Sequence, residues 1–319
     1  MGPQRGRGSK PGKGGAAKGG AAKGGAPRGG PPGRPGPKGR PTRGGAAKGT
    51  PARAGGAPAG RAERARPQKS RGLGGTQVEG RQAVRELLLA GRRKVLEIYL
   101  GNEVERVDII EDILELATEL RVPVREVSRS KLDHLSHTDA PQGIVAIAHQ
   151  LPDEELGLLC RERDGRRPFL LAVDGVTDPG NLGALMRIAE CAGVTGVVLP
   201  KHRAVHVTPT VTKTAAGAIE YLPMALVGGL AAAIEAMKAD GVWVVGLDMA
   251  GETSVHDLEM AGDGVCLVLG AEGRGLSRLV RQRCDVVASI PLYGRLASLN
   301  VASAGAIACY EVARVRESG

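Results

Sequence analysis

Aromatic residues are scarce in this sequence, which has one Trp, one Phe and four Tyr among its 319 residues. Proteins that bind unpaired bases commonly stack them on aromatic side chains, so a stacking platform is not expected here. The GxGxxG fingerprint of dinucleotide-binding domains is also missing, which disfavours a nucleotide-dependent oxidoreductase. Any recognition of a nucleic acid should therefore depend on shape and on phosphate contacts.

Paired cysteines and long apolar runs are missing as well. The five cysteines are far apart, form no CxxC pair and mostly lie in apolar stretches, which predicts reduced core residues: Cys160, Cys191, Cys266, Cys284 and Cys309. No apolar segment follows the amino terminus, and the uncharged, apolar stretch at 222–234 is too short to cross a bilayer. We expect a cytoplasmic protein that contacts no membrane.

The first 75 residues lack almost every side chain that could form a core. They contain 24 of the 49 glycines and 11 of the 20 prolines, and their only large aliphatic residues are Met1 and Leu73. They contain eighteen Lys and Arg and one Glu, which gives a net charge of +17. The remaining 244 residues therefore carry a net charge of −7. We interpret 1–75 as a disordered basic tail. It is either an electrostatic arm for RNA phosphates or a solubilising segment without a part in chemistry.

Residues 76–150 alternate between helical and extended patterns, as in a small α/β domain. Apolar residues predict helices at 81–90 and 104–120 and strands at 95–100, 122–127 and 144–148. Ser128 is a candidate N-cap for a further short helix. Residues 151–168, which end in the polar sequence DGRRP, are interpreted as a linker.

Residues 169–319 carry strands rich in Val, Leu and Ile without polar alternation, which predicts a parallel sheet covered by helices on both faces. We expect strands at 169–173, 197–199, 224–227, 242–247, 265–269 and 286–290, and helices at 181–192, 208–219, 230–239, 276–283 and 298–316. Ligands bind such domains beyond the carboxyl ends of the strands. Three strand-to-loop junctions have the composition of a ligand site.

The first junction is DPGNLGALMR, in which Asn181 begins a helix and Arg187 follows six residues later. Gly180 and Gly183 permit a close backbone approach, and the amino terminus of a helix favours an anion. A tight turn with a capping Asn and a solvated Arg would explain the pattern equally well.

The second junction, GAEGRGLS, follows a buried strand and places Glu272 among three glycines. A carboxylate at this point can accept hydrogen bonds inside a cleft. An ordinary glycine turn with an exposed Glu is the alternative.

The third junction, IPLYGRLASLNVASAGA, is the most specific, because a buried helix rarely begins with so many small residues unless its first turn admits another group. Ser298 and Asn300 supply short polar groups, and three residues supply apolar walls: Ile290, Leu292 and Leu299. A capping Ser on a closely packed helix would explain this junction alone. It is improbable that all three junctions are only ordinary turns or helix caps, so we predict that they share one pocket.

The segments NLGALMR, LGAEGRGLS and IPLYGRLASLNVASAGAI resemble, in this order, the three motifs of the SpoU (TrmH-type) RNA ribose 2′-O-methyltransferases of the SPOUT class. This resemblance covers 169–316. The preceding 76–148, with VEGRQAVRELL and HTDAPQGIVA, is similar to the ribosomal-protein-like, RNA-binding domain of the RlmB type, which modifies a guanosine in 23S ribosomal RNA. The order and spacing of the motifs identify the chain as a member of this class.

The resemblance implies a parallel-sheet fold whose carboxyl-terminal segment is threaded into a deep trefoil knot, and homodimers in which the knot helices pack together. It implies S-adenosylmethionine as methyl donor, bound against five residues: Gly270, Ile290, Leu299, Leu269 and Leu292. The family's active-site positions are occupied by Asn181, Arg187, Glu272, Ser298 and Asn300. The residues that flank SLN in the family, Glu before it and Ser-Val after it, are replaced by Ala297, Ala302 and Ser303.

The implied reaction is displacement at the sulfonium methyl carbon by a ribose 2′-hydroxyl, whose oxygen must be held opposite the leaving sulfur. RNA is the implied partner rather than DNA, because DNA lacks this hydroxyl. A guanidinium is effectively always protonated, so we expect Arg187 to clamp a phosphate and stabilise the alkoxide while Ser298 or a phosphate relays the proton. A transfer RNA or another ribosomal position is an alternative substrate, and a non-catalytic RNA-binding protein is an alternative role.

A histidine pair, His202 and His206, lies beside Lys201 and Arg203. The pair is either part of a loop that faces RNA or a set of hydrogen-bonded structural side chains. No carboxylate or cysteine completes a metal-ligand set there, so no metal is expected.

Overall fold

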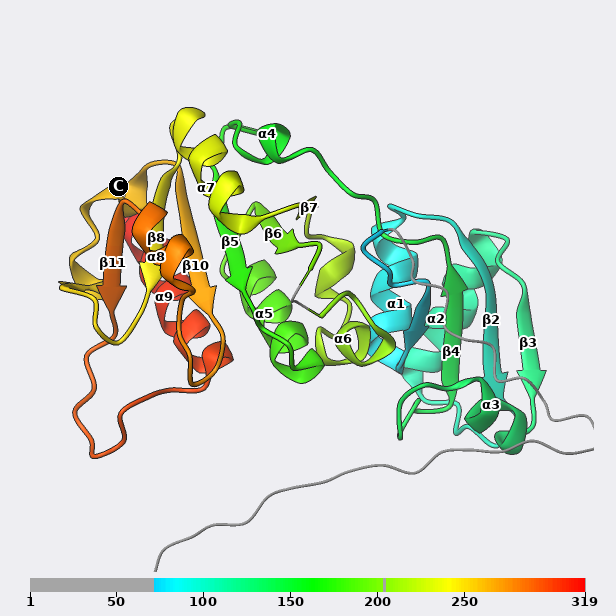
Figure 1. Ribbon diagram of the computed structural model, residues 1–319. Coiled ribbons are helices and arrows are strands. Elements are labelled where there is room, and N and C mark those ends of the chain that lie inside the picture. The colour runs from blue at the N-terminus through cyan, green and yellow to red at the C-terminus, as the bar shows by residue number, and fades with distance from the viewer. Residues whose placement is uncertain (1–71, 203–204, 319) are drawn as a thin grey trace, which may run out of the picture. The chain divides into compact units, whose positions relative to one another are not determined.

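The computed structural model describes residues 72–202 and 205–318 (Figure 1). Most of the predicted tail lies outside the described residues, but its last residues do not. Leu73 is fully buried in the core of the larger sheet, Val207 donates its N–H to the Leu73 carbonyl at 3.0 Å, and Gly75 donates to the Val207 carbonyl at 2.8 Å. The predicted end of the tail at residue 75 is therefore wrong, because Leu73, its one large aliphatic residue after Met1, lies in a core.

The smaller sheet has four strands in the order β1-β4-β2-β3, in which β2 pairs parallel with β3 and antiparallel with β4. Its strands are β1 (Gln77–Glu79), β2 (Val95–Gly101), β3 (Val124–Val127) and β4 (Ile144–Ala148). The apolar stripes of α1 (Arg81–Ala90) and α2 (Asp108–Glu119) pack in one core on this sheet. Leu132 of α3 (Arg129–Leu135) packs in a separate core with Val127 and Val145, and Ser128 caps this helix as predicted. The sequence did not predict β1.

The larger sheet consists of seven strands, all paired in parallel, in the order β7-β6-β5-β10-β8-β11-β9. They are β5 (Phe169–Asp174), β6 (Gly196–Pro200), β7 (Met224–Val227), β8 (Trp243–Leu247), β9 (Thr253–Ser254), β10 (Val265–Gly270) and β11 (Val286–Ser289). The prediction of a parallel sheet is confirmed. The two-residue strand β9 is too short to leave a pattern in the sequence.

Helices cover both faces of the larger sheet, because successive strand residues point to opposite sides. Leu171 and Leu267 pack with α5 (Pro179–Cys191) and α9 (Val301–Ser318), whereas Leu170 and Cys266 pack with α7 (Leu230–Ala239) and α8 (Arg278–Arg283). The shorter helices are α4 (Leu156–Leu159), α6 (Pro209–Thr214) and the 3-10 turn η1 (Ala218–Glu220). Strands buried on both faces explain the runs of Val, Leu and Ile.

Several helices differ in extent from their predicted ranges: α2 begins at Asp108 and not at 104, and α5 begins at Pro179 and not at Asn181. The helix predicted at 208–219 ends at Thr214, because Ala216 and Gly217 adopt positive φ angles of 50° and 90°. The helix predicted at 298–316 begins only at Val301, which leaves the segment before it as a loop. The orange loop between β11 and α9 leaves the sheet before the chain returns to α9 (Figure 1).

Among the described residues, no helix combines the length and the apolar character that a membrane span requires.

Candidate active site

The three predicted junctions all follow strands of the larger sheet. β5 leads into the first, β10 into the second and β11 into the third, and β10 pairs with both β5 and β8. Because these strands are parallel, their carboxyl ends lie at one edge of the sheet. Side chains that are far apart in sequence therefore meet there.

Three of these side chains form one hydrogen-bonded group, which we name the Asn–Glu–Asn cluster: Asn181, Glu272 and Asn300. The Asn181 amide Nδ2 donates to Glu272 Oε1. The Asn300 amide Nδ2 donates to Asn181 Oδ1 at 3.0 Å and to Glu272 Oε1 at 3.1 Å. Each junction thus contributes one member of the cluster.

The helix caps explain why both asparagine amides are available to Glu272. Asp178 caps α5, since its Oδ2 accepts the Asn181 backbone N–H at 2.7 Å. Asn300 Oδ1 accepts the N–H of Ala302 at 2.9 Å and that of Ser303 at 3.3 Å at the start of α9, so only its amide nitrogen points to the cluster. The alternatives in which Asn181 or Ser298 acts as the cap are wrong, because Asp178 and Asn300 satisfy the helix amides.

The turn that carries Glu272 is closed by two hydrogen bonds between its ends. Ala271 donates its N–H to Gly275 at 3.1 Å, and Gly275 donates to Ala271 at 2.9 Å. Gly273 and Gly275 have φ angles of 73° and 64°, which other residues rarely adopt. A Cβ on Gly270 would overlap the Gly275 backbone, so the close approach of strand and turn requires glycine at 270.

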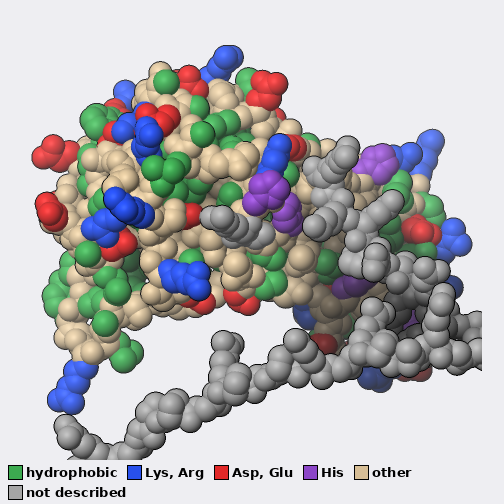
Figure 2. Space-filling model, viewed as in Figure 1, with side chains coloured by type: hydrophobic (Ala, Val, Ile, Leu, Met, Phe, Trp, Pro, Cys, Tyr) green, Lys and Arg blue, Asp and Glu red, His purple; other side chains and the backbone are tan. Residues whose placement is uncertain are grey.

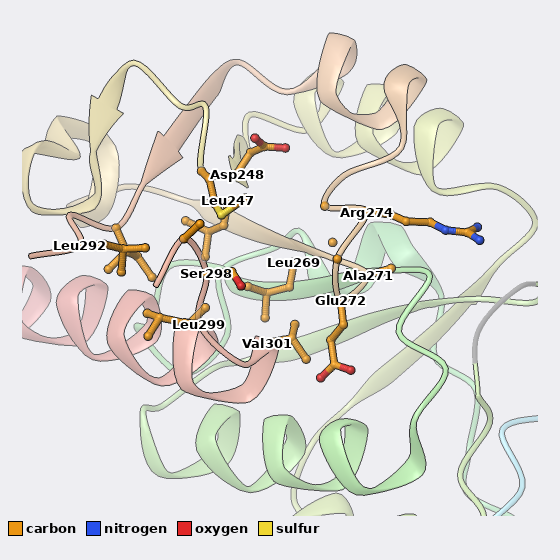
Figure 3. A pocket seen from close by; sticks show the side chains of 17 residues that line it. Leu247, Asp248, Leu269, Ala271, Glu272, Arg274, Leu292, Ser298, Leu299 and Val301 are labelled. Carbon is orange, nitrogen blue, oxygen red and sulfur yellow. The ribbon is translucent and has the colours of Figure 1, made fainter. Parts of the chain in front are cut away.

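A cavity of about 310 Å³ lies beyond the carboxyl ends of β8, β10 and β11 (Figure 3). All five residues that the resemblance implies for the methyl donor line it: Gly270, Ile290, Leu299, Leu269 and Leu292. Glu272 and Ser298 line it as well. We name it the first cavity, and its volume is in the range of small-molecule sites.

A second cavity of about 420 Å³ adjoins the first and differs from it in character. The two share the wall residues Ala271, Glu272 and Arg274. Most side chains of the first cavity are aliphatic, whereas the second has a polar majority: Thr177, Asp178, Asn181, Glu272 and Arg274. Two ligands of different chemistry can therefore lie one on each side of Glu272.

Arg187 is the predicted active-site residue that the structure leaves apart. It is exposed on α5 and lines neither cavity. Asn300 also lines neither cavity, but its hydrogen bonds join it to the wall between them.

The sequence reasoning missed Asp248 and Met249, which line the first cavity directly after β8. Their place after a buried strand is the signal that could have identified them, since ligands bind beyond such strand ends. The Asp248 carboxylate forms an ion pair with Arg281 at 2.8 Å. Arg274, which lines both cavities, was missed as well because only its glycine neighbours were considered.

Histidines take no part in this site. His206 Nε2 lies 3.3 Å from the Lys201 carbonyl oxygen, while Arg203 lies outside the described residues. Within the described ranges, no group of three or more His, Cys, Asp or Glu side chains is arranged to hold a metal ion.

Comparison with known proteins connects this geometry to a family. Residues 168–310 match the SpoU rRNA Methylase family, and residues 77–153 match the family described as RNA 2′-O ribose methyltransferase substrate binding. The chain is 40% identical over 243 residues to the 23S rRNA (guanosine-2′-O-)-methyltransferase RlmB of Coxiella burnetii, an alignment that covers 76% of this chain and 96% of the relative. It is 38% identical over 244 residues to the protein of the same name from Pseudomonas aeruginosa, with 75% and 96% covered.

Solved structures agree with the sequence comparison. The crystal structure of the SpoU methyltransferase AviRb from Streptomyces viridochromogenes, in complex with AdoMet, matches with a TM-score of 0.65 at 27% identity and covers 76% of this chain and 91% of that chain. The AdoMet-bound rRNA methyltransferase from Sinorhizobium meliloti matches with a TM-score of 0.63 at 26% identity, with 75% and 87% covered. The strand-end cavities, the two family matches and the extent of these alignments lead to one conclusion: the chain belongs to the SpoU rRNA methylase family.

Proposed function

We propose that the protein transfers a methyl group from S-adenosylmethionine to the ribose 2′-hydroxyl of a guanosine in 23S ribosomal RNA. The observation that carries this proposal is the Asn–Glu–Asn cluster, which stands between an aliphatic cavity and a polar one. The guanosine and the 23S ribosomal RNA follow from the names of the relatives that are 40% and 38% identical.

The first cavity fits the methyl donor. Leu269, Ile290, Leu292 and Leu299 offer aliphatic walls for the adenine ring, and the backbone at Gly270 is open to close approach. Two related structures that contain AdoMet support the same ligand. When bound, S-adenosylmethionine supplies an electrophilic methyl group on a positively charged sulfur.

The cluster would orient the acceptor sugar at the wall between the cavities. Glu272 Oε1 already accepts N–H from two asparagines, which fixes the carboxylate while leaving lone pairs for a ribose hydroxyl. Ser298 lines the first cavity, where its hydroxyl would relay to solvent the proton that leaves the 2′-oxygen. A fixed carboxylate and a nearby hydroxyl need little rearrangement during the transfer.

We also propose the wider organisation that the resemblance implies. It comprises a basic tail that ends before Leu73, an RNA-binding domain that extends to residue 150, a linker at 151–168 and a methyltransferase domain at 169–319 that is knotted, dimeric and cytoplasmic. The return of α9 to pack against α5 and the exposed apolar side chains of Ile307 and Tyr310 on α9 support a helix-to-helix dimer.

Calorimetry with S-adenosylmethionine tests the donor directly. The expected result is one bound S-adenosylmethionine per chain and no binding of NADH. Binding of NADH alone would contradict the proposal. A protein that binds the donor and RNA without transferring a methyl group would instead be a non-catalytic RNA-binding protein on this fold.

A further inference from the structure

One cation lies where the two cavities meet, and the function proposed above does not use it. Arg274 lines both cavities, and its side chain extends away from Leu269 and Leu299 (Figure 3). The residue is exposed. Within the part of the chain that the structure describes, no carboxylate lies within 4.0 Å of its guanidinium and no hydrogen bond engages it. Its five N–H donors are therefore available to a ligand.

The backbone holds Arg274 in a fixed place. It lies between Gly273 and Gly275 in the turn that the two Ala271–Gly275 hydrogen bonds close. A closed turn limits the positions that the Arg274 Cα can take, so less freedom is lost when a ligand binds.

The second cavity is lined by two carboxylates, Asp178 and Glu272, and by one described cation, Arg274, so an anion in it would have to lie at Arg274. The two carboxylates are already hydrogen-bonded, since Asp178 accepts the Asn181 backbone N–H and Glu272 accepts two side-chain amides. Among the described residues, Arg274 is the only Lys or Arg that lines this cavity. A guanidinium without an ionic partner matches the geometry of a phosphate, which it binds through two parallel N–H donors.

We propose that the second cavity receives the acceptor ribonucleotide and that the Arg274 guanidinium binds a phosphate attached to that nucleotide. The ribose then lies against Glu272, on the opposite side of the wall from the methyl donor. This inference rests on the proposed function and gives it a second site. It places a phosphate contact at Arg274, which lines both cavities, in addition to the clamp expected at Arg187, which lines neither cavity of the single chain.

On the face seen in Figure 2, the described Lys and Arg side chains are interspersed with Asp and Glu and form no single broad basic area. On such a face a phosphate would be held by individual cations rather than by a general positive field.

The test combines a protein variant with a modified RNA. Arg274→Gln removes the charge, and Arg278→Gln is its matched control, because Arg278 is exposed, lines neither cavity and has no ion pair among the described residues. The substrate is a 23S ribosomal RNA fragment, compared with the same fragment carrying one neutral methylphosphonate on either side of the target nucleotide.

Arg274→Gln should raise the KM for the natural RNA about tenfold or more, the effect of losing one charge-assisted hydrogen-bonded contact. One methylphosphonate should raise the KM of the unchanged protein by a similar factor and leave that of Arg274→Gln where it was. Arg278→Gln should behave as the unchanged protein with both RNAs. Calorimetry should give Arg274→Gln the affinity of the unchanged protein for S-adenosylmethionine.

Equal sensitivity of Arg274→Gln and the unchanged protein to both methylphosphonates would overturn the inference. A loss of S-adenosylmethionine affinity as large as the loss of RNA affinity would also overturn it, since Arg274 would then serve the donor cavity. If the unchanged protein transfers no methyl group, the proposed function fails instead. The same RNA comparison, measured as Kd, then still decides whether Arg274 binds a phosphate.

Discussion

Two carboxylates of this protein, Glu220 and Glu272, are both hydrogen-bonded but stand in opposite surroundings. Glu220 is buried against Arg93, with Nη2 to Oε1 at 2.6 Å and Nε to Oε2 at 2.9 Å, and Arg93 Nη1 donates to the carbonyls of Gly75 and His149. Glu272 is exposed in a cavity wall, and its partners are the neutral amides of the Asn–Glu–Asn cluster. The first carboxylate is closed to any ligand, whereas the second keeps its charge and spare lone pairs for one.

The largest effect should come from breaking the buried pair. Glu220→Gln leaves the Arg93 guanidinium without a charge partner at a site where both side chains are at most 2% exposed, and should lower the free energy of unfolding by about 3–5 kcal/mol. Urea unfolding followed by circular dichroism measures this. The control is Glu126→Gln, which removes the partner of Arg106 in an exposed pair and should cost about 0–1 kcal/mol. Equal losses for the two variants would contradict the distinction.

Glu272→Gln should lower the rate of methyl transfer and leave the free energy of unfolding nearly unchanged. It keeps the shape of the side chain but removes the charge from the cavity wall, so the rate of methyl transfer should fall about 10-fold to 100-fold, the worth of one hydrogen bond to a charged group. The free energy of unfolding should change by less than about 1 kcal/mol, as for most exposed substitutions. Initial rates with a 23S ribosomal RNA fragment provide the measurement. Glu162→Gln, at an exposed carboxylate without an ion pair in the described ranges, should leave the rate unchanged.

Buried thiols differ from both carboxylates, because burial without a cationic partner keeps the thiol protonated and neutral. Burial raises the pKa of Cys309 from its usual value of 9.0 to about 12. The folded protein holds this proton more tightly than the unfolded chain, so the contribution to stability is complete below pH 9 and is lost as the pH rises from 9 towards 12. The free energy of unfolding should fall in that window by about 1.4 kcal/mol per pH unit for each such thiol.

Cys309→Ala provides the check on this pH dependence. Urea unfolding at pH 8, 9, 10 and 11 should show that the free energy of unfolding declines less steeply with pH in the variant. The difference in slope should equal the contribution of one thiol, even if the variant is less stable at every pH. Identical slopes for the two proteins would show that Cys309 contributes nothing to the decline. Cys160 and Cys284, whose pKa burial raises to about 11, account for part of the slope that remains.

The parts of this fold that follow from local composition were predictable. The parallel sheet follows from unbroken runs of Val, Leu and Ile, and the prediction of one shared pocket agrees with the hydrogen bond between Asn181 and Glu272. The partners of Arg93 and Leu73 were not predictable, because Glu220 and Val207 lie more than 100 residues away and no local pattern marks them.

The difference between two arginines shows the same limit at the site. Arg187 lies within a recognisable motif, and Arg274 lies between glycines in an ordinary-looking turn. Which of them faces a cavity depends on how separate segments pack, and only Arg274 does so. Composition identified the junctions, but the side chains that share their cavity walls required the three-dimensional arrangement.

The central claim is that three loops far apart in the chain form one site, which transfers a methyl group to a ribose oxygen. The most direct measurement incubates the full-length protein with unmethylated 23S ribosomal RNA and S-adenosylmethionine labelled in its methyl group, followed by alkaline hydrolysis. Alkali cleaves RNA only beside a free 2′-hydroxyl, so the label should appear in a single alkali-resistant dinucleotide that begins with guanosine. Label in mononucleotides, or no label in the RNA, would contradict the claim.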